Sequence, residues 1–137
     1  MNYQAYSTAL IEQVDLHTGQ LDQLSERLSV LNQIEKTAIE RSLQIIVEAA
    51  IGCSKQFGRK YNLVDRADAF QNIEQAASEC GVDQDWYSQL KGAVGMRNAI
   101  VHDYLNLNWQ LIDDVLRTRK YRVVSQFVHL VCSKLRE

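Results

Sequence analysis

The sequence predicts an all-α fold, a four- to five-helix up-and-down bundle that forms one domain over residues 1–137. The chain contains no proline and only six glycines, so long helices meet few interruptions. Apolar residues recur at steps of three and four, which is the spacing of a helix face. Hydrophobic residues make up 46% of the chain and charged residues 23%, which is typical of a globular domain with a single core.

The first two expected helices are Tyr3–Leu28 and Gln33–Phe57. The first carries an apolar stripe with the spacing of a helix–helix seam, made of Leu10, Val14, His17, Leu21, Leu24, Leu28 and Leu31. A histidine on such a stripe is usually held in a helix–helix contact, so His17 is interpreted as structural. The second helix is apolar over so much of its circumference that we expect it at the centre of the bundle.

A polar stripe interrupts the apolar surface of the second helix. It consists of Arg41, Gln44 and Glu48, which follow one another at steps of three and four. Arg41 either pairs with a neighbouring carboxylate, Glu40 or Glu48, as part of the scaffold, or supports an active site. Pairing is the more frequent use of such an arginine.

Polar residues mark the bounds of the third and fourth expected helices. Asp65 is expected to cap a third helix that ends near Cys80, because its carboxylate can accept from free backbone N–H groups. Gly81 then lies where a left-handed conformation is needed. Asp83 is expected to cap the fourth helix. Four small residues in that helix would let a neighbouring helix or a second subunit approach closely, namely Gly92, Ala93, Gly95 and Ala99.

The last expected helix runs over Trp109–Leu135, with Asn108 as its cap. Near its middle lies a basic cluster of Arg117, Arg119, Lys120 and Arg122. Such a cluster is either a nucleic-acid contact or the solvated face of one helix, and the solvated face is the commoner case.

Charge and cysteine content exclude several classes of protein. The formal net charge is -2, so a phosphate-binding surface must be local. Cys53, Cys80 and Cys132 lie far apart, which argues against a disulfide framework or a zinc site.

No basic segment precedes an apolar one at the N-terminus, and no apolar run has the length of a membrane span. We therefore expect a cytoplasmic protein.

The stretch Gly95–Tyr104 concentrates the residues that can carry chemistry. It places Arg97, Asn98, His102 and Tyr104 close together within a helical pattern. The arginine side chain is permanently charged, and its planar guanidinium matches the geometry of a phosphate group. Histidine exchanges protons near neutral pH. This combination suggests chemistry on a phosphodiester.

Helix geometry constrains how these residues can act together. Asn98 and His102 are four apart and share a face, whereas Arg97 and Tyr104 are seven apart and share another. Arg97 and His102 leave a straight helix about 140° apart, so one helix does not aim both at a single atom. Either the arginine bends round, the helix ends near His102, or two copies face each other across a two-fold axis.

Cleavage of RNA would use these residues without a metal. A histidine can take the 2′-hydroxyl proton or protonate the leaving 5′-oxygen, and an arginine can hold the charged phosphorane. Asn98 could orient the substrate or the imidazole. No cluster of histidines and carboxylates supports a metal site, and no cofactor is expected. On spacing alone, the arginine, asparagine and histidine could instead cap helix carbonyls and pair with Asp103.

Residues 97–104, RNAIVHDY, resemble the motif of the HepT-like toxins of the HEPN superfamily: an arginine, a polar residue, three spacers, a histidine, a spacer and a tyrosine. Residues 40–50, ERSLQIIVEAA, are similar to the second helix of that family, and the helix order and length also fit. The resemblance implies an HEPN-like bundle and a homodimeric, metal-independent endoribonuclease whose catalytic residues are Arg97, Asn98 and His102. Supporting roles are expected for Arg41, Glu48 and Asp103.

The resemblance further implies the toxin of a type VII-like toxin–antitoxin system. The antitoxin would be a minimal nucleotidyltransferase of the MntA kind, bound to the homodimer or to a larger assembly, that transfers AMP to Tyr104. A bulky anionic group beside the cleft would repel RNA. The alternative is a non-catalytic HEPN module that docks to a nucleotidyltransferase or binds its substrate.

Overall fold

The structure, a computed structural model that describes residues 1–137, consists of helices and the segments that join them. The elements are α1 (Tyr3–Ser25), η1 (Leu28–Val30), α2 (Gln33–Lys60), α3 (Ala69–Glu79), α4 (Gln84–His102), η2 (Tyr104–Asn106), α5 (Trp109–Arg117) and α6 (Tyr121–Leu135). The all-α prediction is confirmed. The segment expected as one last helix is divided into α5 and α6, which brings the number of α-helices to six.

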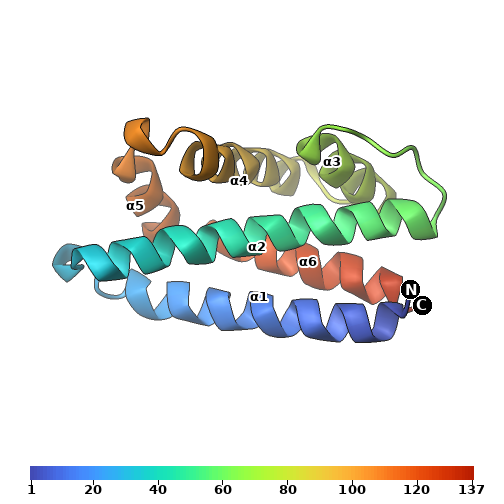
Figure 1. The fold of residues 1–137 in the computed structure, drawn as a ribbon, viewed down its shortest axis with the longest axis horizontal. Coiled ribbons are helices and arrows are strands. Elements are labelled where there is room, and N and C mark those ends of the chain that lie inside the picture. Colours follow the sequence, from blue (N-terminus) through green and yellow to red (C-terminus); the bar gives the residue numbers. More distant parts are fainter.

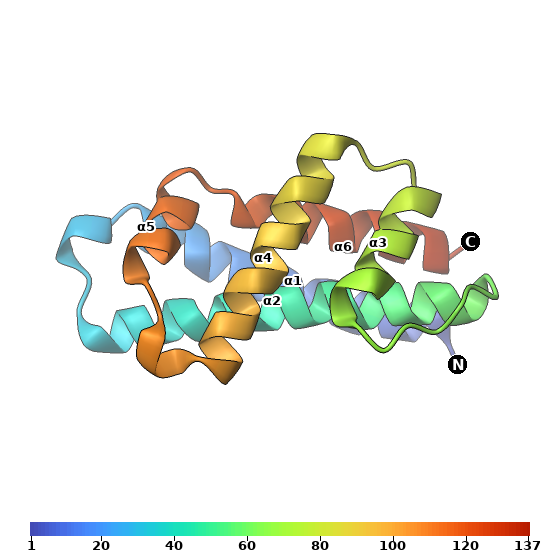
Figure 2. The same ribbon diagram turned by 90° about the horizontal axis from the view of Figure 1, so that it is seen from above.

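Three long helices, α1, α2 and α6, run along the length of the molecule and form its up-and-down part (Figure 1). Helices α3 and α4 lie on the opposite side of α2 from α1, and α4 crosses the long helices steeply (Figure 2). Helix α5 lies at the end of the molecule away from the two termini. The arrangement leaves α4, which carries the motif, as an outer helix.

Helix starts follow the expected chemistry at most positions. Asp83 accepts from the Trp86 amide and Asn108 from the Gln110 amide, which confirms both expected caps. The expected cap at Asp65 is wrong: the third helix is capped by Asp68, whose carboxylate accepts from the Gln71 amide. Asp65 and Asp68 give the same capping signal in the sequence. The connector before α3 is longer than expected, so Asp68 and not Asp65 lies at the start of the helix.

Helix ends are less evident from the sequence. Helix α1 stops at Ser25, short of the expected end at Leu28, and a single 3₁₀ turn follows it. Gly81 adopts φ +72° after α3, as expected for a residue that needs a left-handed conformation. The same conformation occurs at Arg119 with φ +55°, between α5 and α6, where no glycine signals a break.

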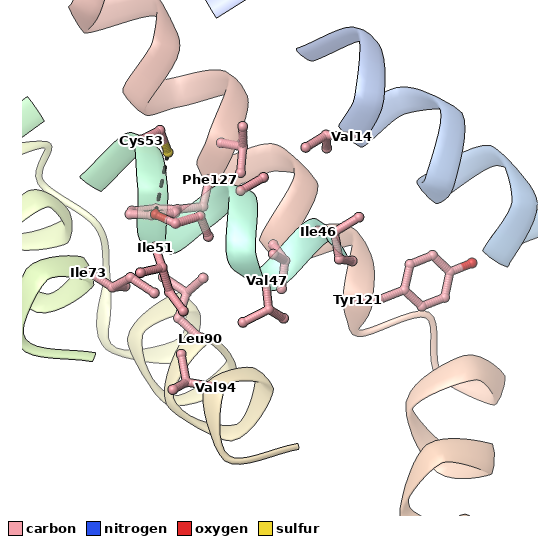
Figure 3. Close-up of a cluster of buried hydrophobic side chains, with 14 of the residues drawn as sticks. Val14, Ile46, Val47, Ile51, Cys53, Ile73, Leu90, Val94, Tyr121 and Phe127 are labelled. Carbon is pink, nitrogen blue, oxygen red and sulfur yellow. Dashed lines mark hydrogen bonds between the residues drawn. The ribbon is translucent and has the colours of Figure 1, made fainter. Parts of the chain in front are cut away.

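The core is built around α2, as predicted. Side chains from α1, α3, α4 and α6 converge on the apolar faces of α2, among them Val14, Ile73, Leu90 and Phe127 (Figure 3). Burying an aliphatic or aromatic side chain of this size contributes about 1.5–3 kcal/mol each. His17 Nδ1 lies 2.9 Å from Ser42 Oγ in the α1–α2 contact, which is the structural role expected for it.

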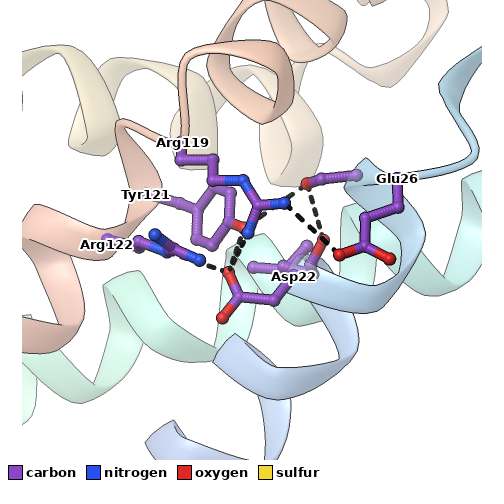
Figure 4. A network of polar contacts seen from close by, with 7 residues as sticks. Asp22, Glu26, Arg119, Tyr121 and Arg122 are labelled. Atoms are coloured by element: carbon purple, nitrogen blue, oxygen red, sulfur yellow. Dashed lines mark hydrogen bonds and ion pairs between the residues drawn. The ribbon is translucent and has the colours of Figure 1, made fainter.

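A polar network fixes the link between α5 and α6 to the end of α1 (Figure 4). Asp22 accepts from the Tyr121 hydroxyl and from Arg122 Nε at 3.0 Å, and Arg119 Nη1 lies 3.4 Å away. Arg117 pairs with Asp113 on its own helix at 3.0 Å. Three of the four cations in the basic cluster are therefore engaged in ion pairs within the chain, which favours the solvated-face interpretation.

No helix in the structure combines the length and the apolar character needed to cross a membrane.

Candidate active site

The motif lies at the C-terminal end of α4 and in the turn that follows (Figure 2). His102 is the last residue of α4, and the amide of Asp103 closes the helix by donating to the Ala99 carbonyl. Tyr104 begins the 3₁₀ turn η2 and lies outside the helix. The expectation that Arg97 and Tyr104 share a helix face is therefore wrong, because the helix ends between them.

Arg97 is held between α4 and α2. Its Nη2 lies 3.5 Å from Glu48 Oε1, and its Nη1 donates to Asn98 Oδ1 at 2.9 Å. Glu48 Oε1 also accepts from Gln44 Nε2 at 3.0 Å, so the carboxylate is itself fixed in place. The side chain of Arg97 is 21% exposed. Glu48, for which a supporting role was expected, thus contacts the motif; the role itself stays a prediction.

One nitrogen of this arginine has no partner. Nε of Arg97 is buried and makes no hydrogen bond within the chain. A buried donor left unpaired costs about 1–3 kcal/mol, so such groups are rare and tend to mark sites that another molecule completes. Arg97 is therefore oriented by Glu48 and Asn98, and its partly exposed guanidinium remains accessible to an anionic ligand.

His102, Asn98 and Asp103 are exposed at the end of α4. His102 makes no hydrogen bond or ion pair in the chain. Asp103 accepts from Asn106 Nδ2 at 2.8 Å and pairs with neither Arg97 nor His102. The capping arrangement that spacing alone allowed, in which these groups pair with Asp103, is not what the structure shows.

Arg41 is not brought to the motif. It is exposed on α2 and forms neither of the ion pairs considered for it, with Glu40 or with Glu48. Burial lowers the pKa of His17, and the positive charge of Arg41 lowers it further. Arg41 and Glu48 differ by only about 20° around α2 and so share a face, but they are about two turns apart along the helix, and only Glu48 contacts the motif.

Glu40 and Trp109 form a second polar contact, close in sequence to the end of the motif. Tyr104 is 51% exposed, and the influence of the Glu40 carboxylate raises the pKa of its hydroxyl. Glu40 is only 5% exposed and accepts from Trp109 Nε1 at 2.6 Å. Sequence reasoning considered Glu40 only as a partner for Arg41. Its position on an otherwise apolar face of α2 was the signal that could have identified it.

A groove of about 740 Å³ runs beside α4, between that helix and the segments that follow it. Its apolar lining includes Ala93, Met96, Leu107, Leu111, Val115 and Val124, and Arg97 lies on its wall. Gly92 and Gly95 also line it, and a Cβ added at either glycine would meet no heavy atom within 4 Å. Gly92 and Gly95 therefore face open space, as the approach of a second subunit would require.

Within one chain, the two residues suited to phosphodiester chemistry do not converge. Arg97 is directed toward α2, whereas His102 is exposed at the helix end, five residues further on. The structure contains no group of three or more histidine, cysteine, aspartate or glutamate side chains that could hold a metal ion. The site thus contains one cation held by neighbouring side chains, Arg97, and one exposed imidazole without a partner, His102, which is a type of group that can transfer protons.

Comparison with known proteins places this geometry in context. A family model described as ribonuclease HepT-like matches residues 9–131. Among curated proteins, no relative matches this sequence.

Two solved structures share the fold. A tri-AMPylated HEPN toxin of Shewanella oneidensis, in complex with an MNT antitoxin, is similar with a TM-score of 0.79 at 20% identity, over 93% of this chain and 96% of that one. A toxin–antitoxin crystal structure with AMP-PNP is similar with a TM-score of 0.77 at 20% identity, over 91% of this chain and 96% of that one.

Proposed function

This chain belongs to the HepT-like ribonuclease family, and on that premise we propose that it is the toxin of a toxin–antitoxin pair, an endoribonuclease that cleaves RNA without a metal. Cleavage proceeds by attack of the 2′-hydroxyl on the adjacent phosphorus. The bond to the 5′-oxygen of the next nucleotide breaks, and the products carry a 2′,3′-cyclic phosphate and a 5′-hydroxyl.

The observation that carries this proposal is the contrast between Arg97 and His102. Arg97 is held by Glu48 and Asn98 and remains partly exposed, which suits a group that binds the charged phosphorane. His102 is exposed and has no partner, which suits a group that must exchange protons with substrate. Asn98 lies next to Arg97 and four residues before His102, where it can orient either one.

A second copy of the chain completes the site in this proposal. Arg97 and His102 of one chain point in different directions, and a two-fold axis would bring the two ends of α4 together. The apolar groove beside α4 supports this arrangement, because its small residues leave room for a neighbouring helix. In the dimer, two copies of His102 divide the acid and base roles.

Neutralisation is proposed to occur at Tyr104. A minimal nucleotidyltransferase of the MntA kind transfers AMP to the hydroxyl, which is half exposed and lies two residues beyond His102. The added phosphodiester places negative charge and bulk beside Arg97 and His102, so RNA is repelled and its path is blocked. The AMPylated HEPN toxin among the similar structures supports this choice of modification.

The test is an RNA cleavage assay in the presence of EDTA. Wild type is compared with His102→Ala and with the matched control His129→Ala, because His129 is also exposed but pairs with Asp15 on the far side of the bundle. We expect cyclic-phosphate ends from wild type and from His129→Ala, and none from His102→Ala.

Two results would contradict the proposal. Equal cleavage by His102→Ala would remove this histidine from the reaction. If dimeric wild type, shown by mass spectrometry to be free of AMP, cuts no RNA, the chain is instead a non-catalytic module that docks to a nucleotidyltransferase.

A further inference from the structure

A second pocket, of about 410 Å³, lies at the end of the molecule that carries α5 and shares no lining residue with the groove beside α4. Its walls come from the segment around η1, the first turn of α2, and α5. Its charged side chains are Lys36, Asp113 and Arg117, and Trp109 supplies its aromatic surface. None of these residues takes part in the proposed cleavage of RNA.

Lys36 is the charged group in this pocket that has no counter-charge. Its ammonium makes no ion pair or hydrogen bond within the chain and lies 5.4 Å from the centre of the Trp109 ring. The carboxylate of Glu40, one turn further along α2, instead accepts from Trp109 Nε1 at 2.6 Å. The indole is thereby fixed, and its attraction for the ammonium holds Lys36 at the wall of the pocket.

Arg117 adds a second cation to the pocket. Its Nη2 and Nε lie 3.0 and 3.3 Å from Asp113 Oδ2, and its side chain is 64% exposed. An exposed pair of this kind contributes at most about 1 kcal/mol, so it positions the guanidinium and leaves it able to bind an anion. With two cations and one carboxylate, the pocket is locally positive, although the whole chain has a net charge of -2.

The pocket lies within reach of an RNA strand that occupies the motif. Lys36 and Glu48, the partner of Arg97, are twelve residues apart on α2, which corresponds to about 18 Å along its axis. At the ~3.4 Å spacing of stacked nucleotides, this is a span of about five nucleotides. The exposed residues 102–106 lead from the end of α4 toward the start of α5, where Trp109 lines the pocket (Figure 2).

We propose that this pocket binds a backbone phosphate of the RNA substrate, about five nucleotides from the phosphate that is cleaved. The proposal rests on the proposed function, in which RNA is the substrate. Lys36 and Arg117 hold the phosphate oxygens, and Trp109 keeps Lys36 in position. Phosphate contacts fix the register of a strand without reading its sequence, so the pocket favours RNA that is long enough to reach it. The phosphates of a free nucleotide have the same chemistry, and the test separates the two.

The salt dependence of RNA binding measures a phosphate contact directly. Each contact to a single strand contributes about 0.7 to the slope of log K against log salt concentration. Binding of a fluorescein-labelled, unstructured RNA of about 12 nucleotides is followed by anisotropy between about 0.05 and 1 M KCl, with the full chain carrying His102→Ala so that the RNA stays intact. Adding Lys36→Ala should lower the slope by about 0.7 and weaken binding about fivefold at ~0.1 M salt, with little difference near 1 M.

Two further variants separate this contact from a general effect of charge. Lys36→Arg keeps a cation at the pocket and should retain the slope. Lys55→Ala removes the same charge from an exposed position on α2 outside the pocket, and should leave the slope unchanged. Binding of ATP to the same proteins, in the same salt series, tests the free nucleotide as the ligand.

The proposal is overturned if Lys36→Ala leaves the slope for RNA unchanged, or if Lys55→Ala lowers it equally. A loss of affinity for ATP without a change in the RNA slope would also overturn it and would assign the pocket to a free nucleotide. RNA cleavage by wild type reports separately on the proposed function. Cleavage together with an unchanged slope in Lys36→Ala would refute the pocket alone, so the two can fail independently.

Discussion

Glu48 on α2 and Arg97 on α4 form an ion pair in which the carboxylate oxygen lies 3.5 Å from the guanidinium nitrogen. The same oxygen accepts a hydrogen bond from Gln44 Nε2 at 3.0 Å, so Gln44 also holds the Glu48 carboxylate in place. The pair is partly exposed, and pairs of this kind contribute little to stability. The ion pair instead fixes the position of the positively charged Arg97 guanidinium.

Replacing Glu48 with alanine tests this positioning role. We expect kcat for RNA cleavage to fall about tenfold, because Arg97 loses its orientation, while KM does not rise, because a negative charge near the substrate has been removed. The free energy of unfolding should change by less than about 0.5 kcal/mol. Glu12→Ala, on the exposed face of α1, is the matched control. A rise in KM with unchanged kcat would show that Glu48 does not orient Arg97 for the proposed reaction.

Replacing Tyr104 with phenylalanine separates cleavage from neutralisation. The hydroxyl is absent from the proposed cleavage chemistry, so RNA cleavage should stay within about threefold of wild type. If the proposal holds, co-expression with a minimal nucleotidyltransferase of the MntA kind should no longer add AMP or rescue growth. Intact-mass measurement of the purified toxin provides the readout, and a variant that still gains the mass of AMP would place the acceptor elsewhere.

Replacing Leu111 with aspartate tests the groove as the dimer surface. Leu111 lines the groove and is 59% exposed, so the monomer should fold normally while a charge in a buried apolar interface should prevent association. Sedimentation velocity should show a dimer for wild type and a monomer for the variant, with loss of RNA cleavage. Val64→Asp, at an equally exposed apolar residue outside the groove, should remain dimeric and active. A dimeric Leu111→Asp protein would exclude this surface.

Replacing Asp22 with asparagine tests the network that divides α5 from α6. Partial burial pushes the pKa of Asp22 upward, but hydrogen bonds from Arg122 and Tyr121 and the charge of Arg119 outweigh it, so this pKa lies below its usual 3.8. Stability from a depressed carboxyl pKa is present above the unfolded value and is lost as pH falls through the folded value. Urea unfolding should show the variant about 1 kcal/mol less stable at pH 7 and pH 5, with the difference shrinking below about pH 4.

The matched control for that measurement is Asp65→Asn, an exposed aspartate in the connector before α3. It should differ from wild type by no more than about 0.5 kcal/mol at any pH. If the penalty of Asp22→Asn stays constant down to pH 3, the charge of Asp22 is not what stabilises the network.

Much of the fold could be predicted because the relevant signals are local. The helix starts at Asp83 and Asn108, the left-handed turn at Gly81 and the central position of α2 all follow from a residue and its near neighbours. The break between α5 and α6 could not be predicted in this way. It occurs at Arg119, which adopts a conformation that glycine would favour and is held there by Asp22 from α1.

The sequence by itself determined the helical class, the family and the motif that carries Arg97 and His102, since each depends on residue type and spacing along one helix. Only the tertiary structure decided which carboxylates serve that motif. Glu48 meets Arg97, and Glu40 meets Trp109, through contacts between helices distant in sequence. Side-chain partners across a helix crossing depend on packing angle and rotamer, and spacing along a chain contains neither.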